Sequence, residues 1–155
     1  MASTISSAPL YVTIKESVML KGREQGGTTE LTISGINEIS KRIVTATTTE
    51  ATILTFSSAI GAGTYIAANV RYMRFTNLDD TNHITLTFKD EDNTEFRVKV
   101  DAGQSFIYNA DSAGGLVDTM KASGSALASG LADLYDVTVD ADTDSCDLEI
   151  FIASV

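Results

Sequence analysis

The stretch Val70–Val100, VRYMRFTNLDDTNHITLTFKDEDNTEFRVKV, decides the fold class of this chain. Apolar and polar residues alternate in three runs within it, a pattern typical of strands that have one buried side and one solvent-facing side. In the second run, Ile84, Leu86 and Phe88 fall on one side and threonines on the other. Clusters rich in Asn and Asp separate the runs and predict turns. We therefore expect consecutive antiparallel strands here.

The apolar side of such a sheet needs a cover, and the rest of the chain supplies further strands for it. Short extended segments separated by turn residues precede and follow the central stretch, and many of them are rich in Thr, which favours strands. The sequence predicts an all-β protein, an antiparallel β-sandwich of the jelly-roll-like kind. We expect about eight to ten short strands and at most one short helix.

A chain of 155 residues is long enough for one domain with a substantial core. Residues 1–10 begin with small polar side chains and are expected to form an N-terminal arm, and residues 11–155 a single β-sandwich domain. Within that domain, residues 110–130 are rich in Ala, Gly and Ser and predict a long loop. Long loops in compact domains are often functional.

The net charge of −10 is unevenly distributed along the chain. Residues 1–75 have seven Lys or Arg and five acidic residues, whereas residues 76–155 have four and sixteen. The acidic half would repel phosphate groups, so we expect no nucleic-acid partner. A basic patch formed in space by the early Lys and Arg residues is the alternative.

The sequence offers little for catalysis. Cys146 is the only cysteine and His83 the only histidine, and no Gly-x-Ser-x-Gly motif or metal-binding pair of histidines is present. We expect a small structural cysteine, with a Cys146–His83 nucleophile as the alternative. The protein is predicted to be a non-enzyme without a cofactor. No signal peptide and no membrane-spanning run are apparent, so no membrane partner is expected.

Alternating carboxylates form the strongest chemical constellation. Asp140, Asp142, Asp144 and Asp147 lie in and beside a predicted turn, and such oxygens can gather around Ca²⁺. The EF-hand pattern fails, because Ser145 takes the glycine position and Phe151 the position of the final Glu. We expect solvated turn residues and no metal, with these four as the Ca²⁺ candidates.

Two other groups of residues have ordinary structural explanations. The acidic cluster Asp90–Asp92 falls at a predicted hairpin tip, where polar residues limit strand pairing. The five tyrosines could stack on sugar rings, but their scatter along the chain favours core and rim positions. Carbohydrate recognition is therefore kept as an alternative.

The segment Asn69–Phe88, NVRYMRFTNLDDTNHITLTF, resembles small virion proteins of tailed bacteriophages, in which a strand of this kind runs into a polar turn and returns. Two later segments are similar to the same family, GQSFIYNA at residues 103–110 and LYDVTVDADTDSCDLEIFIAS at residues 134–154. The resemblance covers roughly the second half of the chain.

This resemblance implies a β-sandwich subunit built into a phage particle, first of all a capsid decoration or cement protein. The implied partners are the major capsid protein and further copies of the chain, with a trimer among the expected states. The implied location is the capsid surface, after synthesis in the bacterial cytoplasm. Tail, portal-vertex and fibre components, including a glycan-binding adhesin, are the alternatives. Residues 1–10 and 110–130 are expected to make the shell contacts.

Overall fold

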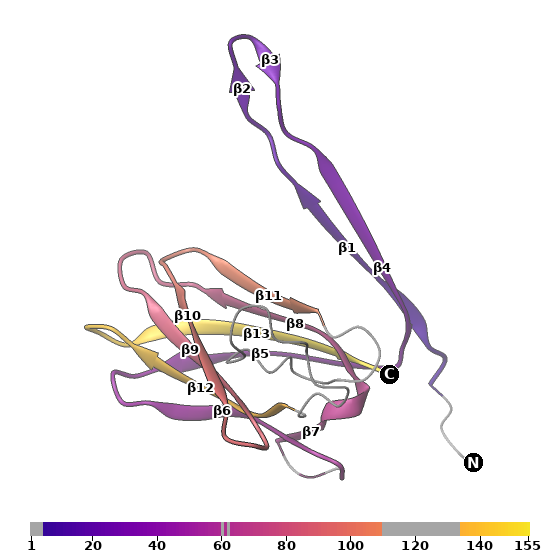
Figure 1. Ribbon diagram of the computed structural model, residues 1–155, viewed down its shortest axis with the longest axis vertical. Helices are drawn as coiled ribbons and strands as arrows, with labels where there is room; N and C mark the ends of the chain where they lie inside the picture. The colour runs from indigo at the N-terminus through magenta and orange to yellow at the C-terminus, as the bar shows by residue number, and fades with distance from the viewer. Residues whose placement is uncertain (1–4, 60, 62, 110–133) are drawn as a thin grey trace, which may run out of the picture.

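Two β-sheets face each other in the computed structural model, which describes residues 5–59, 61, 63–109 and 134–155 (Figure 1). The five-stranded sheet has the order β10 (Glu95–Val100), β9 (Ile84–Asp90), β12 (Leu134–Ala141), β6 (Ala51–Ser57) and β7 (Thr64–Ile66). The four-stranded sheet has the order β11 (Ser105–Asn109), β8 (Val70–Asn77), β13 (Cys146–Ser154) and β5 (Glu38–Ala46). The described residues contain one short 3-10 helix, Ala67–Asn69. The predicted all-β sandwich is confirmed.

The connections give the sandwich its jelly-roll topology. Among the described residues, five connections pass from one sheet to the other: β5 to β6, β7 to β8, β8 to β9, β10 to β11 and β12 to β13. All neighbouring strands pair antiparallel except β6 and β7, which are parallel. The expected pairing of consecutive strands is wrong for β8 and β9, because β8 pairs with β11 and β13 in the opposite sheet.

The core lies between the two sheets and is formed by the alternating residues of their inner sides. Ile84, Leu86 and Phe88 of β9 are fully buried, as the sequence pattern predicts. Thr87 departs from that pattern: it falls on the outer side, yet it is only 2% exposed. In the pairing of β9 with β12, Thr138 lies opposite Thr87 on the same outer side. An interior strand of a sheet can bury a side chain without a second covering layer.

A hairpin arm, residues 8–36, projects from the sandwich (Figure 1). Strands β1 (Ala8–Lys15) and β4 (Thr28–Ile36) form its stem, and β2 (Met19–Leu20) and β3 (Arg23–Glu24) form its tip. The sequence-based boundary of an arm at residue 10 falls inside β1. The projecting segment is therefore a paired ribbon and extends far beyond the first ten residues. The expected loop at 110–130 lies outside the described residues.

Candidate interaction surface

The stem of the hairpin arm has one apolar face. Residues paired across β1 and β4 share a face, so Leu10, Val12 and Ile14 lie together with Leu31 and Ile33. Near the sandwich this face is covered: Leu10, Val12 and Ile33 pack against a small cluster centred on three buried residues, Ile36, Tyr72 and Ala153. Tyr72 and Ala153 belong to the outer side of the four-stranded sheet, so the arm is anchored there.

Farther from the sandwich the same apolar face is open to solvent. Ile14 is 48% exposed and Leu31 is 38% exposed, and Val18, Met19 and Leu20 continue the exposed apolar surface towards the tip. An isolated two-stranded hairpin is at best marginally stable in water. Large apolar side chains gathered on a protruding element are typical of a surface that another molecule covers.

The tip of the arm carries two cations. Lys21 and Gly22 have positive φ angles of 51° and 76°, which is the geometry of a two-residue I′ turn between β2 and β3. Glu24 accepts hydrogen bonds from the backbone amides of Val18 and Gly26 and from the Ser17 hydroxyl. These bonds lower the pKa of Glu24 and hold its carboxylate beside Ser17, Val18 and Gly26. Lys21 and Arg23 are left exposed at the end of the arm.

The outer side of the four-stranded sheet is the second exposed apolar feature. Ile39 and Ile43 of the edge strand β5 are 52% and 59% exposed. Between them lies an ionic group in which Glu149 contacts Arg74 at 2.6 Å and Lys41 at 3.2 Å. Phe151 of β13 lies beside this group and packs edge-on against Tyr72, with ring centroids 6.0 Å apart. The face therefore combines compensated charges with open aliphatic surface.

The ionic group should make stability depend on pH. Hydrogen bonds from Arg74 and then Lys41 hold the pKa of Glu149 below its ordinary value of 4.5. The folded state therefore binds fewer protons than the unfolded state, and the contribution is present above pH 4.5 and lost as the pH falls below it. We expect Glu149→Gln to lower the free energy of unfolding by about 1 kcal/mol at neutral pH.

Urea denaturation at neutral pH and at a series of lower values tests this expectation. The difference between wild type and Glu149→Gln should shrink as the pH falls. Glu30→Gln, which removes an exposed carboxylate on β4, is the matched control. A difference that is constant with pH, or equal in the two variants, would contradict the role given to the ionic group.

The Ca²⁺ candidates lie where the β12–β13 connection approaches other loops, but they do not converge. Asp142 contacts His83, with 3.4 Å between Oδ2 and Nδ1, and Asp147 accepts a 3.0 Å hydrogen bond from Thr45. The Oδ1 atom of Asp140 is buried without a hydrogen-bond partner among the described residues. Among all the residues that the structure describes, no three His, Cys, Asp or Glu side chains are grouped so that they could hold a metal ion.

Cys146 occupies a structural position. Its side chain is 1% exposed, and its Sγ lies 3.5 Å from the Asp144 carbonyl oxygen and 3.9 Å from those of Asn82 and His83. Burial raises the pKa of this thiol, and the negative charges of nearby aspartates raise it further. A thiol of this kind is a poor nucleophile. The contact with His83 is to its backbone, while the imidazole is directed to Asp142.

The acidic cluster at the β9–β10 hairpin divides into a structural residue and two exposed ones. Asp90 is buried, and its Oδ1 accepts hydrogen bonds from the backbone amides of Asp92 and Thr94, at 3.0 and 2.7 Å. Asn93 in the same turn has a positive φ of 63°. Asp90 therefore shapes the turn, while Glu91 and Asp92 face solvent.

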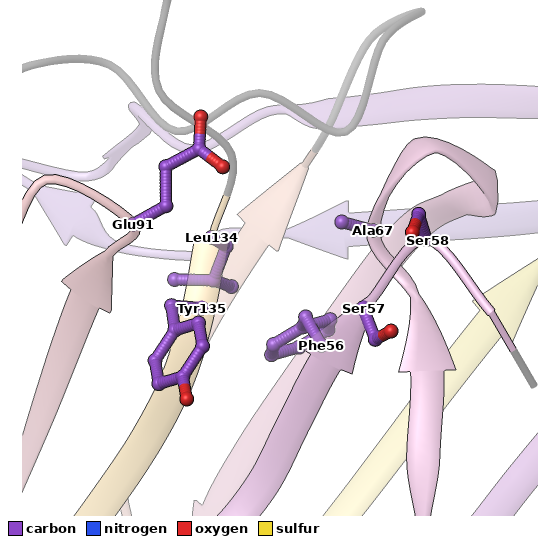
Figure 2. A pocket seen from close by; sticks show the side chains of 7 residues that line it. All are labelled: Phe56, Ser57, Ser58, Ala67, Glu91, Leu134 and Tyr135. Atoms are coloured by element: carbon purple, nitrogen blue, oxygen red, sulfur yellow. The ribbon is translucent and has the colours of Figure 1, made fainter. Parts of the chain in front are cut away.

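A cavity of about 320 Å³ opens beside β6 and β12 (Figure 2). Its side chains come from several elements: Phe56, Ser57, Ser58, Ala67, Glu91, Leu134 and Tyr135. Figure 2 shows the Tyr135 ring and the Glu91 carboxylate on the β12 side, and Phe56 and the two serines on the β6 side. Among the described residues of this lining, Glu91 is the one with a carboxylate. An aromatic ring with hydroxyls and one acid suits weak contact with a polar ligand.

Comparisons with known proteins found no relative of this chain. No protein-family model matches it, and neither the curated proteins nor the solved structures give a significant match. Among the described residues, no helix has the length and apolar character needed to cross a membrane.

Proposed function

We propose that this chain is a non-enzymatic structural subunit of a tailed-phage particle, a decoration or cement protein of the capsid surface. The observation that supports the proposal best is the hairpin arm, which extends past the sandwich and leaves Ile14, Val18, Met19 and Leu20 exposed. A protein built for assembly needs such a surface, whereas a protein that works alone gains nothing from it. The sequence resemblance supplies the phage context.

The proposed partners are the major capsid protein and other copies of this chain. Several modest contacts made together bind far more tightly than any one of them, because each bound contact raises the effective concentration of the next. The arm is the first candidate for such contacts, since it reaches away from the sandwich (Figure 1). Residues 110–130 remain a proposed contact segment.

The copy number of the chain in purified particles tests this function. Quantitative mass spectrometry should find it in numbers comparable to those of the major capsid protein. Particles that carry an arm-deleted chain should lose it while their other components are retained. A few copies per particle would move the protein to a tail, vertex or fibre position, and its absence from particles would contradict a virion role.

A glycan-binding fibre or adhesin is the second candidate, and the cavity beside Tyr135 favours it. Tyr135 is 52% exposed next to Glu91 and two serine hydroxyls, a combination that can stack on and hydrogen-bond to a sugar ring. Jelly-roll sandwiches occur among both viral capsid and lectin domains, so the fold is compatible with either role. A low copy number together with binding of purified protein to host glycans would favour this candidate.

A further inference from the structure

We propose that the hairpin arm of one copy of this chain lies along the outer face of the four-stranded sheet of a second copy. The exposed apolar residues of the arm, Ile14 and Val18–Leu20, would cover Ile39 and Ile43, and the tip would reach the β12–β13 turn. The contact stands on its own geometry and holds whether or not the protein belongs to a phage particle.

The same type of contact already exists within one chain, which is the first argument. The base of the arm packs its apolar face on the outer side of the four-stranded sheet, at Tyr72 and Ala153. The next residue across the sheet in that row is Ile39, paired with Ala153. The arm then leaves the sandwich (Figure 1), and Ile43 is 59% exposed. A second copy can extend the contact along the remaining surface.

The order of apolar and charged residues matches on the two surfaces. Along the arm, Ile14 and, beyond the polar residues 15–17, Val18, Met19 and Leu20 are followed by Lys21 and Arg23. Along the sheet, Ile39 and Ile43 flank Lys41, whose charge is paired with Glu149, and they are followed by Asp147, which lies opposite Thr45 on the same face. A ribbon laid on this face with its tip pointing from Ile39 towards Thr45 would bring Lys21 and Arg23 next to Asp147 once its apolar part is seated.

The spacings agree as well. A strand rises about 3.3 Å per residue, so Ile14 and Lys21 are at most about 23 Å apart along the arm, and Ile39 and Thr45 are about 20 Å apart along β5. The hairpin arm, residues 8–36, contains three Lys or Arg and three acidic residues, so the whole net charge of −10 lies on residues 37–155. An arm with cations at its tip is therefore attracted to the body of another copy.

The receiving face, which is the outer side of the four-stranded sheet around Ile39 and Ile43, also has a hollow that could take a side chain. An apolar hollow of about 230 Å³ lies beside Ile39, with Ile5, Pro9, Leu10 and Ile36 among its lining residues. An aliphatic residue of the incoming stem fits the chemistry of this hollow. The arm of one copy contacts the receiving face of another, so the two copies contribute different surfaces to each contact. Repetition of this contact closes a ring, or two copies exchange arms and form a dimer with two such contacts.

Complementation between two variants tests the proposal. Ile14→Asp damages the arm, and Ile43→Asp damages the receiving face while leaving the arm intact. Sedimentation of the full chain should show an oligomer for wild type and monomers for each variant alone, with Kd raised about thirtyfold or more. A mixture of the two variants retains one intact contact and should form a heterodimer. Thr13→Asp, on the opposite face of the stem, should leave the oligomer unchanged.

Cross-linking locates the contact. Chains with Val18→Cys are mixed with size-tagged chains with Ile43→Cys, and a short bismaleimide should join them, whereas Thr13→Cys should give no product with the same partner. A wild-type chain that stays monomeric at micromolar concentration would overturn the proposal. An arm that is protected from proteolysis only when capsid shells are added would overturn it as well. An oligomer that survives Ile43→Asp would overturn it too. None of these results depends on the copy number in particles.

Discussion

Replacing Phe88 by alanine is expected to lower the free energy of unfolding by about 3–5 kcal/mol, which is a large part of the stability of an ordinary domain. Phe88 of β9 is fully buried at the centre of the core. Its ring stacks on Phe96 at 4.8 Å and meets Phe75 of the opposite sheet edge-on at 5.6 Å. Phe106 and Tyr108 also contact it, at 5.4 and 5.9 Å. The cavity left by this ring would therefore lie between the two sheets and remove contacts from both.

Chemical denaturation monitored by circular dichroism measures this loss. Phe88→Leu keeps part of the volume and should be clearly less destabilising. Phe151→Ala is the matched control, because Phe151 is a half-buried phenylalanine on the outer side of a sheet with Tyr72 as a ring partner. Equal losses at the two positions would show that Phe88 does not have the central place assigned to it.

Replacing Asn77 by alanine should cost about 2 kcal/mol or more, because it leaves buried backbone groups without partners. Asn77 is the last residue of β8 and is fully buried. Its amide nitrogen donates to the carbonyl oxygens of Asn82 and Val100, at 2.9 and 3.2 Å. Its Oδ1 accepts a 3.0 Å hydrogen bond from the backbone amide of Asp79. One side chain thus joins the β8–β9 turn to the end of β10.

Thermal and urea unfolding of three variants separates the hydrogen bonds from simple loss of volume. Asn77→Asp keeps the size and the acceptor but removes both amide donors, and it should be destabilising at neutral pH. Asn109→Ala removes an exposed asparagine at the end of β11 and should have little effect. If Asn77→Asp were as stable as wild type, the two bonds to the carbonyl oxygens would not matter.

The candidate surface was only partly predictable from the sequence. Alternation of Leu10, Val12 and Ile14 indicates a strand, but it does not say whether the strand lies in the sandwich or outside it. The acidic turn drew attention as a metal candidate, whereas the described structure directs Asp142 to His83 and Asp147 to Thr45. The Glu149 ion pairs join three strands far apart in the sequence, so no local pattern could indicate them.

Local pattern by itself determined the secondary structure and fold class. Alternation at Ile84, Leu86 and Phe88 specifies which side of a strand is buried, because the side-chain period of a strand is two residues. The tertiary structure decided which strands are neighbours: β13 pairs with β5 and β8, and β8 does not pair with β9. Pairing of distant strands depends on how all inner faces bury one another, and local residues do not encode that. The same long-range packing leaves the distal half of the arm uncovered.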